Sequence, residues 1–188
     1  MQLISFEKFT EDGLSLDNNK TAMTVGVFDG VHLGHKKLLK RIVSHNSNLI
    51  PVVVTFKKIN KPNCIDIQTF EERMSFLKKY GIKIVIVIDF TQEFMRMPGV
   101  EFLKLLLKQG NIGYFAVGEN FCCGHQTDTD ARAIKIFFES HNTAAGIVTD
   151  VMEGSQPISS SRIREAIAAG DITLAEKMLG RSLKERVC

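Results

Sequence analysis

Short runs of β-branched residues alternate along this chain with amphipathic stretches of helical length, and this alternation constrains the fold more than any other feature. In the amphipathic stretches, apolar residues recur three and four positions apart, as they do on one face of a helix. The alternation predicts a parallel sheet whose strands are connected by helices. The expected strands span residues 23–28, 49–55, 83–88, 114–117 and 146–150.

Helices are expected between these strands and after the last one. The connecting helices span residues 34–44, 71–80, 99–108 and 131–141, and two further helices span residues 160–169 and 174–179. Gly170 and Asp171, a helix-stopping glycine and an N-capping aspartate, separate the last two. We therefore predict an α/β fold, a Rossmann-like doubly wound parallel sheet of five strands with helices on both faces. Ligands of such sheets bind beyond the carboxyl ends of the strands, where the first strand turns into its helix.

Length and charge indicate one domain that binds small anions. A chain of 188 residues fits a single domain, 1–188. The net charge of +3 is mild and the lysines are scattered along the sequence, which favours small anionic ligands over nucleic acid. The amino terminus lacks an apolar secretory region, and the longest aliphatic run, Ile84–Ile88, is too short to cross a bilayer. We expect a cytoplasmic protein that contacts no membrane.

The loop after the first expected strand has the composition of a phosphate site. Residues 26–35 read Gly-Val-Phe-Asp-Gly-Val-His-Leu-Gly-His and lead into a helix. At a helix start the free N–H groups and the positive end of the dipole favour phosphate, and Gly30 and Gly34 let the backbone come close to it. His32 and His35, three residues apart, would share one face and donate to the phosphoryl oxygens. A pair of this kind can also simply cap a helix and face solvent.

A second helix start follows the fifth expected strand. Ser159, Ser160 and Ser161 are good N-caps, and their hydroxyl groups lie beside the free amides of the helix. Arg162 and Arg164 add planar cationic groups that suit phosphate oxygens. The set predicts a second anion site, although a serine-rich helix start with arginines can also be a solvated cap.

Three segments together resemble the bacterial FAD synthetase family of the nucleotidylyltransferase superfamily. They are the loop at 26–35, the Val-Gly-Glu-Asn-Phe segment at 117–121, and the Ser-Ser-Arg-Ile-Arg segment at 160–164. The last is similar to the superfamily's Ile-Ser-Ser-Thr-x-x-Arg motif, with Ser161 and Arg164 in the threonine and arginine positions. Residues 175–181 also look like the helix and linker that close the family's adenylyltransferase module. The resemblance implies transfer of the adenylyl group of ATP to FMN, which releases pyrophosphate and makes FAD.

The resemblance also implies a role for each matching residue. His32, His35 and Arg164 would be the catalytic residues. ATP would be bound by Gly26, Phe28, Asp29, Gly30, Gly34, Ser160, Ser161 and Arg162, and a nucleotide and flavin loop would contain Gly118 and Asn120. Two assignments have alternatives, because Asn120 could be a turn residue and Asp29 could fix the loop through its own backbone hydrogen bonds.

Magnesium is the expected cofactor, bound with ATP through phosphate oxygens, and the sequence indicates no protein ligand for it. In bifunctional family members a riboflavin kinase barrel follows the module, whereas this sequence ends at Cys188. The expected partners are therefore ATP and FMN as substrates and a separate riboflavin kinase as the supplier of FMN.

Two segments depart from the family pattern. Where the family commonly has Thr-Phe-x-Pro-His-Pro, residues 55–60 read Thr-Phe-Lys-Lys-Ile-Asn, and Lys57 or Lys58 could replace the missing charge or could be solvated. After Phe121 the family has an arginine-phenylalanine pair and a basic loop, whereas this chain has Cys122 and Cys123. The cysteines lack the spacing of a zinc site or a disulfide framework, so we interpret them as reduced thiols without special reactivity.

Two other functions stay open at this point. The chain could transfer a nucleotide to another acceptor of the superfamily, such as glycerol phosphate with CTP, or a nicotinate or pantetheine phosphate with ATP. It could also be a flavin or nucleotide sensor that has lost catalysis. A sensor of flavin alone would have little need for both phosphate motifs.

Overall fold

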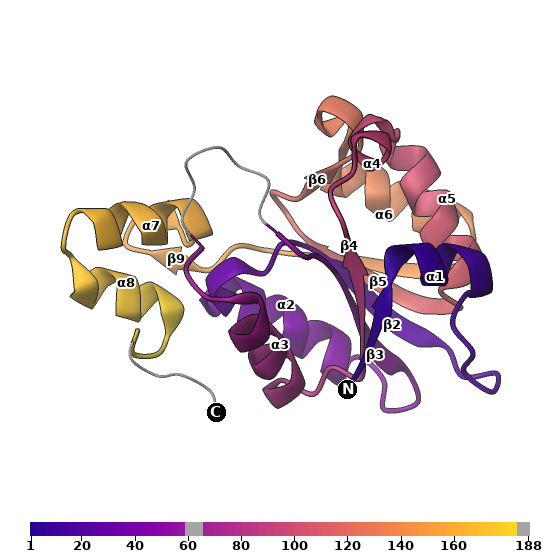
Figure 1. Ribbon diagram of the computed structural model, residues 1–188, viewed down its shortest axis with the longest axis horizontal. Helices are drawn as coiled ribbons and strands as arrows, with labels where there is room; N and C mark the ends of the chain where they lie inside the picture. Colours follow the sequence, from indigo (N-terminus) through magenta and orange to yellow (C-terminus); the bar gives the residue numbers. More distant parts are fainter. Residues whose placement is uncertain (59–65, 184–188) are drawn as a thin grey trace.

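A six-stranded parallel sheet forms the centre of the computed structural model, which describes residues 1–58 and 66–183. The strand order is β1-β4-β3-β2-β5-β8 (Figure 1). These strands are β1 (Gln2–Ser5), β2 (Thr21–Val25), β3 (Ile50–Phe56), β4 (Ile84–Ile88), β5 (Ile112–Gly118) and β8 (Ala144–Val148). The predicted α/β class and doubly wound parallel sheet are confirmed, because the chain passes from β2 to β3 on one side and to β5 on the other.

The prediction of five strands was wrong, because the sheet has a sixth strand at its edge. β1 pairs in parallel with β4, Gln2 opposite Ile84 and Ser5 opposite Val87. An edge strand of four residues that buries little surface carries no continuous apolar run, so periodicity cannot detect it. The short helix α1 (Phe6–Asp12) follows, with Ser5 as its N-cap.

Helices cover both faces of the sheet, as predicted (Figure 1). On one face lie α2 (Leu33–Ser44) and α3 (Phe70–Lys79), and on the other lie α1, α5 (Gly99–Gln109) and α6 (Ala131–Ser140). Strand side chains alternate between the two cores: Val52 and Val54 pack with the α1, α5 and α6 side, and Val53 packs with the α2 and α3 side. The chain also forms α4 (Gln92–Arg96), which its sequence pattern did not predict.

The last two helices form a unit of their own beside the sheet. α7 (Ser160–Ala168) and α8 (Ile172–Leu179) pack through a third apolar cluster that includes Ile163 and Met178. As predicted, Gly170 ends the first helix with a φ of 77° and Asp171 caps the second. In Figure 1 this pair lies beyond the carboxyl end of β2, beside the start of α2.

The remaining elements are short and lie in the connections. Two antiparallel hairpins are β6 (Cys122–Cys123) with β7 (Thr129–Asp130), and β9 (Met152–Glu153) with β10 (Gln156–Pro157). Two one-turn 3-10 helices are η1 (Asp29–Val31) and η2 (His125–Thr127). Within the described parts of the chain, no helix has both the length and the apolar character needed to cross a membrane.

Candidate functional site

The turn that follows β2 is folded in an unusual backbone conformation. β2 ends at Val25 and not at Phe28 as predicted, because Phe28 takes left-handed angles, with φ of 55° and ψ of 28°. Gly30 and Val31 also have positive φ, 78° and 37°. Positive φ is costly for side chains other than glycine and persists only when the surroundings impose it. The ring of Phe28 is fully buried, so core packing helps to hold the turn in this form.

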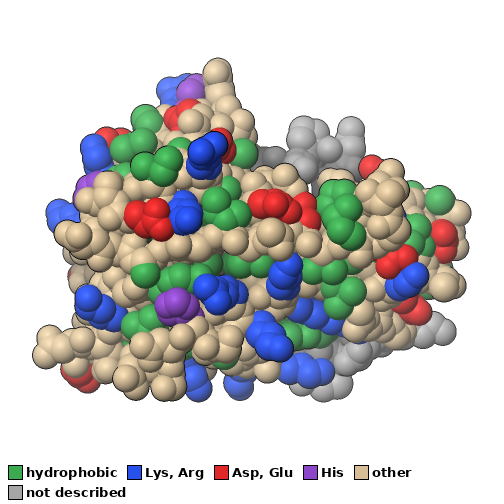
Figure 2. Space-filling view, turned by 180° about the vertical axis from the view of Figure 1, so that it is seen from behind, with side chains coloured by type: hydrophobic (Ala, Val, Ile, Leu, Met, Phe, Trp, Pro, Cys, Tyr) green, Lys and Arg blue, Asp and Glu red, His purple; other side chains and the backbone are tan. Residues whose placement is uncertain are grey.

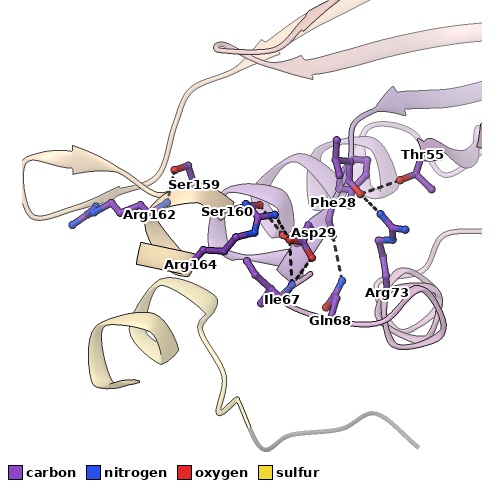
Figure 3. Close-up of polar contacts among 11 residues, drawn as sticks. Phe28, Asp29, Thr55, Ile67, Gln68, Arg73, Ser159, Ser160, Arg162 and Arg164 are labelled. Atoms are coloured by element: carbon purple, nitrogen blue, oxygen red, sulfur yellow. Dashed lines mark hydrogen bonds and ion pairs between the residues drawn. The ribbon is translucent and has the colours of Figure 1, made fainter. Parts of the chain in front are cut away.

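Four consecutive carbonyl groups of this turn, from Val27 to Gly30, accept hydrogen bonds from side chains of other segments. Figure 3 shows four of the donors, which are Thr55, Arg73, Gln68 and Ser160. The donors are Thr55 Oγ1 at 3.1 Å and Arg73 Nη1 at 2.6 Å to Val27, Gln68 Nε2 at 3.2 Å to Phe28, Ser160 Oγ at 2.8 Å to Asp29, and Arg181 Nη1 at 2.7 Å to Gly30. The turn is therefore held on its carbonyl side by residues distant in sequence.

Asp29 links the turn to two further segments. Its side chain is 2% exposed, accepts from the Ile67 amide at 3.1 and 3.3 Å, and forms an ion pair of 2.5 Å with Arg164 (Figure 3). Burial raises the pKa of Asp29, while the Ile67 amide and the Arg164 charge oppose that shift. Asp29 was expected either to bind ATP or to fix the loop through its own backbone hydrogen bonds. These contacts agree with a residue that fixes the loop, but its carboxylate bonds to residues distant in sequence and not to its own backbone.

His32 and His35 lie together at the start of α2. His32 is the N-cap, and its Nδ1 accepts from the His35 amide at 3.4 Å. The two rings are stacked with centroids 3.7 Å apart, so the expectation that they share one face is confirmed. Nδ1 of His35 is buried and has no hydrogen-bond partner among the described residues. The pair therefore does more than cap a helix in solvent, because His32 is buried and His35 is partly buried.

Both imidazoles are neutral near pH 7. Burial, followed by the charge of Arg181, lowers the pKa of His32 to about 4. Burial, followed by the charges of His32 and Arg73, lowers the pKa of His35 well below its ordinary value. A neutral imidazole still donates from one of its nitrogens, so both rings can bind a phosphoryl oxygen without carrying charge.

The glycines of this segment differ in what they permit. A Cβ on Gly34 would lie 3.1 Å from the His32 ring, and Gly30 needs its φ of 78°. A Cβ on Gly26 would meet the Phe28 ring at 3.1 Å, so Gly26 allows that ring to pack. Gly30 and Gly34 therefore permit the backbone conformation of the turn and of the start of α2. Gly26 leaves room for the Phe28 ring to pack in the core.

The polar residues at the start of α7 contact two different parts of the protein, the turn after β2 and the β9–β10 hairpin. Ser159 is the N-cap, accepting from the Arg162 amide at 3.2 Å, while Ser160 and Arg164 reach Asp29. Arg162 Nη1 instead donates to the carbonyl of Gln156 in β10 at 3.0 Å. In Figure 3 the Arg162 side chain points away from Asp29. Ser161 is exposed. The structure thus brings Ser160 and Arg164 to the turn, but it places Arg162 on the β9–β10 hairpin.

The loop after β5 is tied to the loop after β8. Gly118 ends β5, the Glu119 amide donates to the Val148 carbonyl at 3.0 Å, and Asn120 Nδ2 donates to the Asp150 carboxylate. Burial, followed by the charge of Glu119, raises the pKa of Asp150. Asn120 is exposed and bound to another loop residue, which agrees with the turn-residue alternative as well as with a ligand-facing role.

The segment with the two cysteines folds back on the start of α5. Asp128 accepts from the Gly99 amide at 3.0 Å, and the His125 amide donates to Met97 at 2.9 Å. Cys122 and Cys123 are free thiols, and Cys64 and Cys188 lie outside the described residues. Burial, followed by the charges of Asp128 and Cys122, raises the pKa of Cys123 to about 12. A thiol with such a pKa is not nucleophilic near neutrality, which agrees with the interpretation of Cys123 as a thiol without special reactivity.

The lysines that follow β3 are exposed. Lys57 forms an ion pair with Asp89 at 3.9 Å, with both side chains more than half exposed, so the pair contributes little to stability. Lys58 is also exposed, and Ile59 and Asn60 of the same segment lie outside the described residues.

The tertiary structure gathers some of the scattered basic residues into one groove between α2 and β8. Lys37, Lys40 and Arg41 line it, beside Ile147 and Val148. The face turned away in Figure 1 shows Lys, Arg and His side chains together next to a strip of hydrophobic ones (Figure 2). Lys37 Nζ donates to Thr149 Oγ1 at 2.7 Å and Arg41 Nε to the Tyr114 hydroxyl at 2.8 Å, so neutral partners hold these cations.

Sequence motifs did not reveal three residues of the site: Gln68, Arg73 and Arg181. Arg73 is 4% exposed and sits between apolar positions of the buried face of α3, which is an unusual place for a charge. A charged residue at a buried helix position is therefore the sequence signal that could have identified Arg73. Arg181 follows the glycine that ends α8, and the resemblance of residues 175–181 to the family's closing helix and linker implied no role for it in the site. Among the described residues, no group of three or more His, Cys, Asp or Glu side chains could hold a metal ion.

Comparison with known proteins gives results for both the sequence and the fold. A family model described as FAD synthetase matches residues 14–162. A bifunctional riboflavin kinase/FMN adenylyltransferase of Buchnera aphidicola from Schizaphis graminum is 27% identical over 174 residues, covering 87% of this chain and 56% of the relative. An FAD synthetase of Listeria monocytogenes is 26% identical over 172 residues, covering 87% of this chain and 70% of the relative. This chain thus spans little more than half the length of the Buchnera relative.

A crystal structure described as a macrolide-efflux protein from Streptococcus pneumoniae superposes with a TM-score of 0.83 at 27% identity. The match covers 97% of this chain and 61% of that protein. Nearly the whole of the described fold, including the α7–α8 pair, therefore has a counterpart in a solved structure.

Proposed function

The chain belongs to the FAD synthetase family, and on this premise we propose that it transfers the adenylyl group of ATP to the phosphate of FMN, making FAD and pyrophosphate. One observation carries the proposal: two helix starts of the kind that bind phosphate meet at a single buried residue. Asp29 accepts from Arg164 and, through its carbonyl, from Ser160 at the start of α7, while it leads directly into the start of α2. Two converging helix starts suit a polyphosphate better than a single anion.

For this reaction the protein must align the two substrates and stabilise the charge that develops in the transition state. The phosphate of FMN has a second pKa near about 6, by analogy with other phosphate monoesters, so near neutrality it is largely a dianion and needs no general base. In the proposal, its oxygen attacks the α-phosphorus of ATP, the bond to the β-phosphate oxygen breaks, and pyrophosphate leaves. The neutral imidazoles of His32 and His35 would donate to the α-phosphoryl oxygens as charge develops there.

The start of α7 would hold the leaving group. Arg164 donates through Nη2 to Asp29, and a guanidinium has several N–H groups, so in the proposal Arg164 would also contact phosphate oxygens. Ser161 is exposed at the first turn and can donate its hydroxyl, and Arg162 could turn from the hairpin to the β- and γ-phosphates because its side chain is partly exposed. Gly118 and Asn120 would border the nucleotide and the flavin from the loop after β5.

A divalent metal, proposed to be Mg²⁺, fits this site as a companion of ATP. The carboxylate closest to the turn, Asp29, is already bound to Arg164 and the Ile67 amide, and the described residues hold no ready-made metal cluster. When bound, the ion would neutralise phosphate charge, and its ligands would be phosphate oxygens and water. The protein residues named above would then orient the phosphates.

The supply of FMN is a separate matter in this proposal. FMN is the product of riboflavin phosphorylation, so a riboflavin kinase activity must provide the acceptor. The proposal covers adenylyl transfer by residues 1–188 as one domain, and we expect riboflavin itself to be no acceptor.

The test is incubation of the purified protein with ATP, FMN and magnesium, with CTP and riboflavin as controls, followed by chromatography of FAD and pyrophosphate. We expect equal amounts of FAD and pyrophosphate from ATP and FMN, and no flavin product from riboflavin. Binding of FMN or ATP without any FAD would favour a sensor. Pyrophosphate release with another phosphorylated acceptor, but not with FMN, would favour a different transferase.

A further inference from the structure

The end of α8 lies directly on the start of α2. Gly180 is the C-cap of α8, with φ of 64° and ψ of 30°, and its carbonyl accepts from Lys36 Nζ at 3.2 Å. A Cβ on Gly180 would come within 2.5 Å of Leu33 Cδ2, so only glycine permits this approach. The next residue, Arg181, therefore lies beside the carbonyl groups of the turn that follows β2.

The guanidinium of Arg181 makes three contacts that fix its plane. It lies over the ring of Phe76 at 4.2 Å, Nη1 donates to the Gly30 carbonyl at 2.7 Å, and Nη2 donates to Gln68 Oε1 at 3.1 Å. Gln68 Nε2 in turn donates to the Phe28 carbonyl at 3.2 Å. One arginine thus holds two carbonyls of the turn, the first directly and the second through Gln68.

The first of these carbonyls belongs to a residue under backbone strain, because Phe28 has a positive φ, whereas glycine takes a positive φ at little cost. Phe28 and Gly30 both have positive φ, and no peptide bond in the described residues is cis. In a trans peptide the C=O and the following N–H point in opposite directions. Holding the Phe28 carbonyl therefore orients the amide of Asp29 toward the opposite side, whereas the amide of Val31, which follows Gly30, donates to the Phe28 carbonyl at 3.3 Å and closes the turn.

We propose that Arg181 is a positioning residue for nucleotide binding: it keeps the turn in its strained form so that the start of α2 and His32 meet the phosphates of ATP. The proposal rests on the proposed function for its substrate, and it adds a residue that lies outside the family's phosphate motifs. A lysine could not replace Arg181, because a single ammonium group has neither the flat surface for Phe76 nor the fork that reaches Gly30 and Gln68 together.

The experiment compares Arg181→Ala and Arg181→Lys with wild type, and uses Arg132→Ala, an exposed arginine of α6, as the matched control. FAD synthesis and ATP binding by calorimetry are measured for each protein. We expect kcat/KM for ATP to fall about 10- to 100-fold in both Arg181 variants, because a small displacement of a positioning group costs up to about that factor. Arg132→Ala should match wild type.

A second readout separates positioning from a purely structural role. The ring resonances of His32, assigned with a His32→Gln spectrum, are titrated by NMR. In Arg181→Ala the pKa of His32 should rise from about 4 toward its ordinary 6.5, because a nearby positive charge is gone and the ring is more open to water. If Arg181→Ala does not fold, Gln68→Met provides the test, since it removes the bonds of Gln68 to Phe28 and Arg181 but leaves the bond from Arg181 to Gly30. A smaller loss in the same direction is expected.

Three outcomes would overturn the proposal. They are a lower melting temperature with unchanged ATP affinity and kcat/KM, full rescue by Arg181→Lys, or an unchanged titration of His32. Failure of the proposed function is distinguishable, because it would appear as wild type that binds ATP but makes no FAD. In that case ATP affinity and the His32 titration still decide the role of Arg181.

Discussion

The turn at residues 27–35 and the loop at residues 121–130 follow neighbouring strands of one sheet, β2 and β5, but the rest of the chain holds them differently. The carbonyls of the turn are bound by side chains from β3, α3, α7 and the segments around Gln68 and Arg181. The loop makes its main-chain contacts with the start of α5, through Asp128 to Gly99 and His125 to Met97. Most of its side chains are exposed.

This difference predicts that the two regions tolerate substitution differently. In the turn, a substitution disturbs several elements at once, because Asp29 alone connects η1, residue 67 and α7. The loop with Cys122 and Cys123 depends mainly on its contacts with the residues at the start of α5. Many parts of the fold thus determine the conformation of the turn, and a few contacts determine that of the loop.

The largest effect is expected from the turn. His35→Ala should lower kcat for FAD synthesis about 10²- to 10³-fold, the usual cost of removing one donor to developing charge. Its effect on the melting temperature should be smaller, because the ring packs on Phe28 and His32 but is not itself a member of an apolar cluster. Kinetics and thermal unfolding are measured beside His125→Ala, an exposed histidine of the loop. A His35→Ala protein with a much lower melting temperature but an unchanged kcat would contradict this prediction. An equal loss of kcat in His125→Ala would also contradict it.

The next effect concerns stability. Asp29→Ala should lower the free energy of unfolding by about 2 kcal/mol, somewhat less than the cost of breaking a fully buried pair, because Arg164 is 18% exposed and can reach water. Urea unfolding measures the change. Asp128→Ala, which removes the carboxylate of the loop, is the matched variant and should cost less. Equal losses in the two variants would show that the loop is held as firmly as the turn.

The third prediction uses pH. The pKa of His32 is about 4 in the folded chain and near 6.5 when unfolded, so the unfolded state binds more protons between these values and stability falls as pH decreases through them. The loss from this group is about 2 kcal/mol at pH 5 relative to pH 8. His32→Gln should flatten the dependence, whereas His125→Gln should not. Parallel stability curves for His32→Gln and wild type would contradict the neutral, buried imidazole.

The smallest effect is expected from the loop. Cys122→Ser with Cys123→Ser should leave kcat and KM within about twofold of wild type, because the thiol of Cys123 has a pKa of about 12 and is not a nucleophile near neutrality. Mass spectrometry after brief iodoacetamide treatment at pH 7.5 should find Cys123 unmodified. A large loss of activity, or rapid labelling of Cys123, would assign the loop a chemical role and weaken the contrast with the turn.

Periodicity predicted the inner strands and the long helices because each buries a regular face. The apolar run Ile84–Ile88 fits a buried strand. The spacing of apolar residues in α5 fits a helix with one buried face. The local motifs also identified the helix starts at His32 and Ser160, since capping depends on neighbours in sequence. β1 escaped detection because an exposed edge strand is defined by its partner, β4.

The sequence by itself thus determined the doubly wound sheet, both phosphate-type helix starts and the family. Only the tertiary structure decided how these parts meet: that Arg164 reaches Asp29 while Arg162 turns to a hairpin, that Arg73 and Arg181 hold the turn by its carbonyls, and that both histidines are neutral. Local structure follows from spacing along the chain, whereas burial, charge proximity and shared hydrogen bonds exist only when distant segments come into contact.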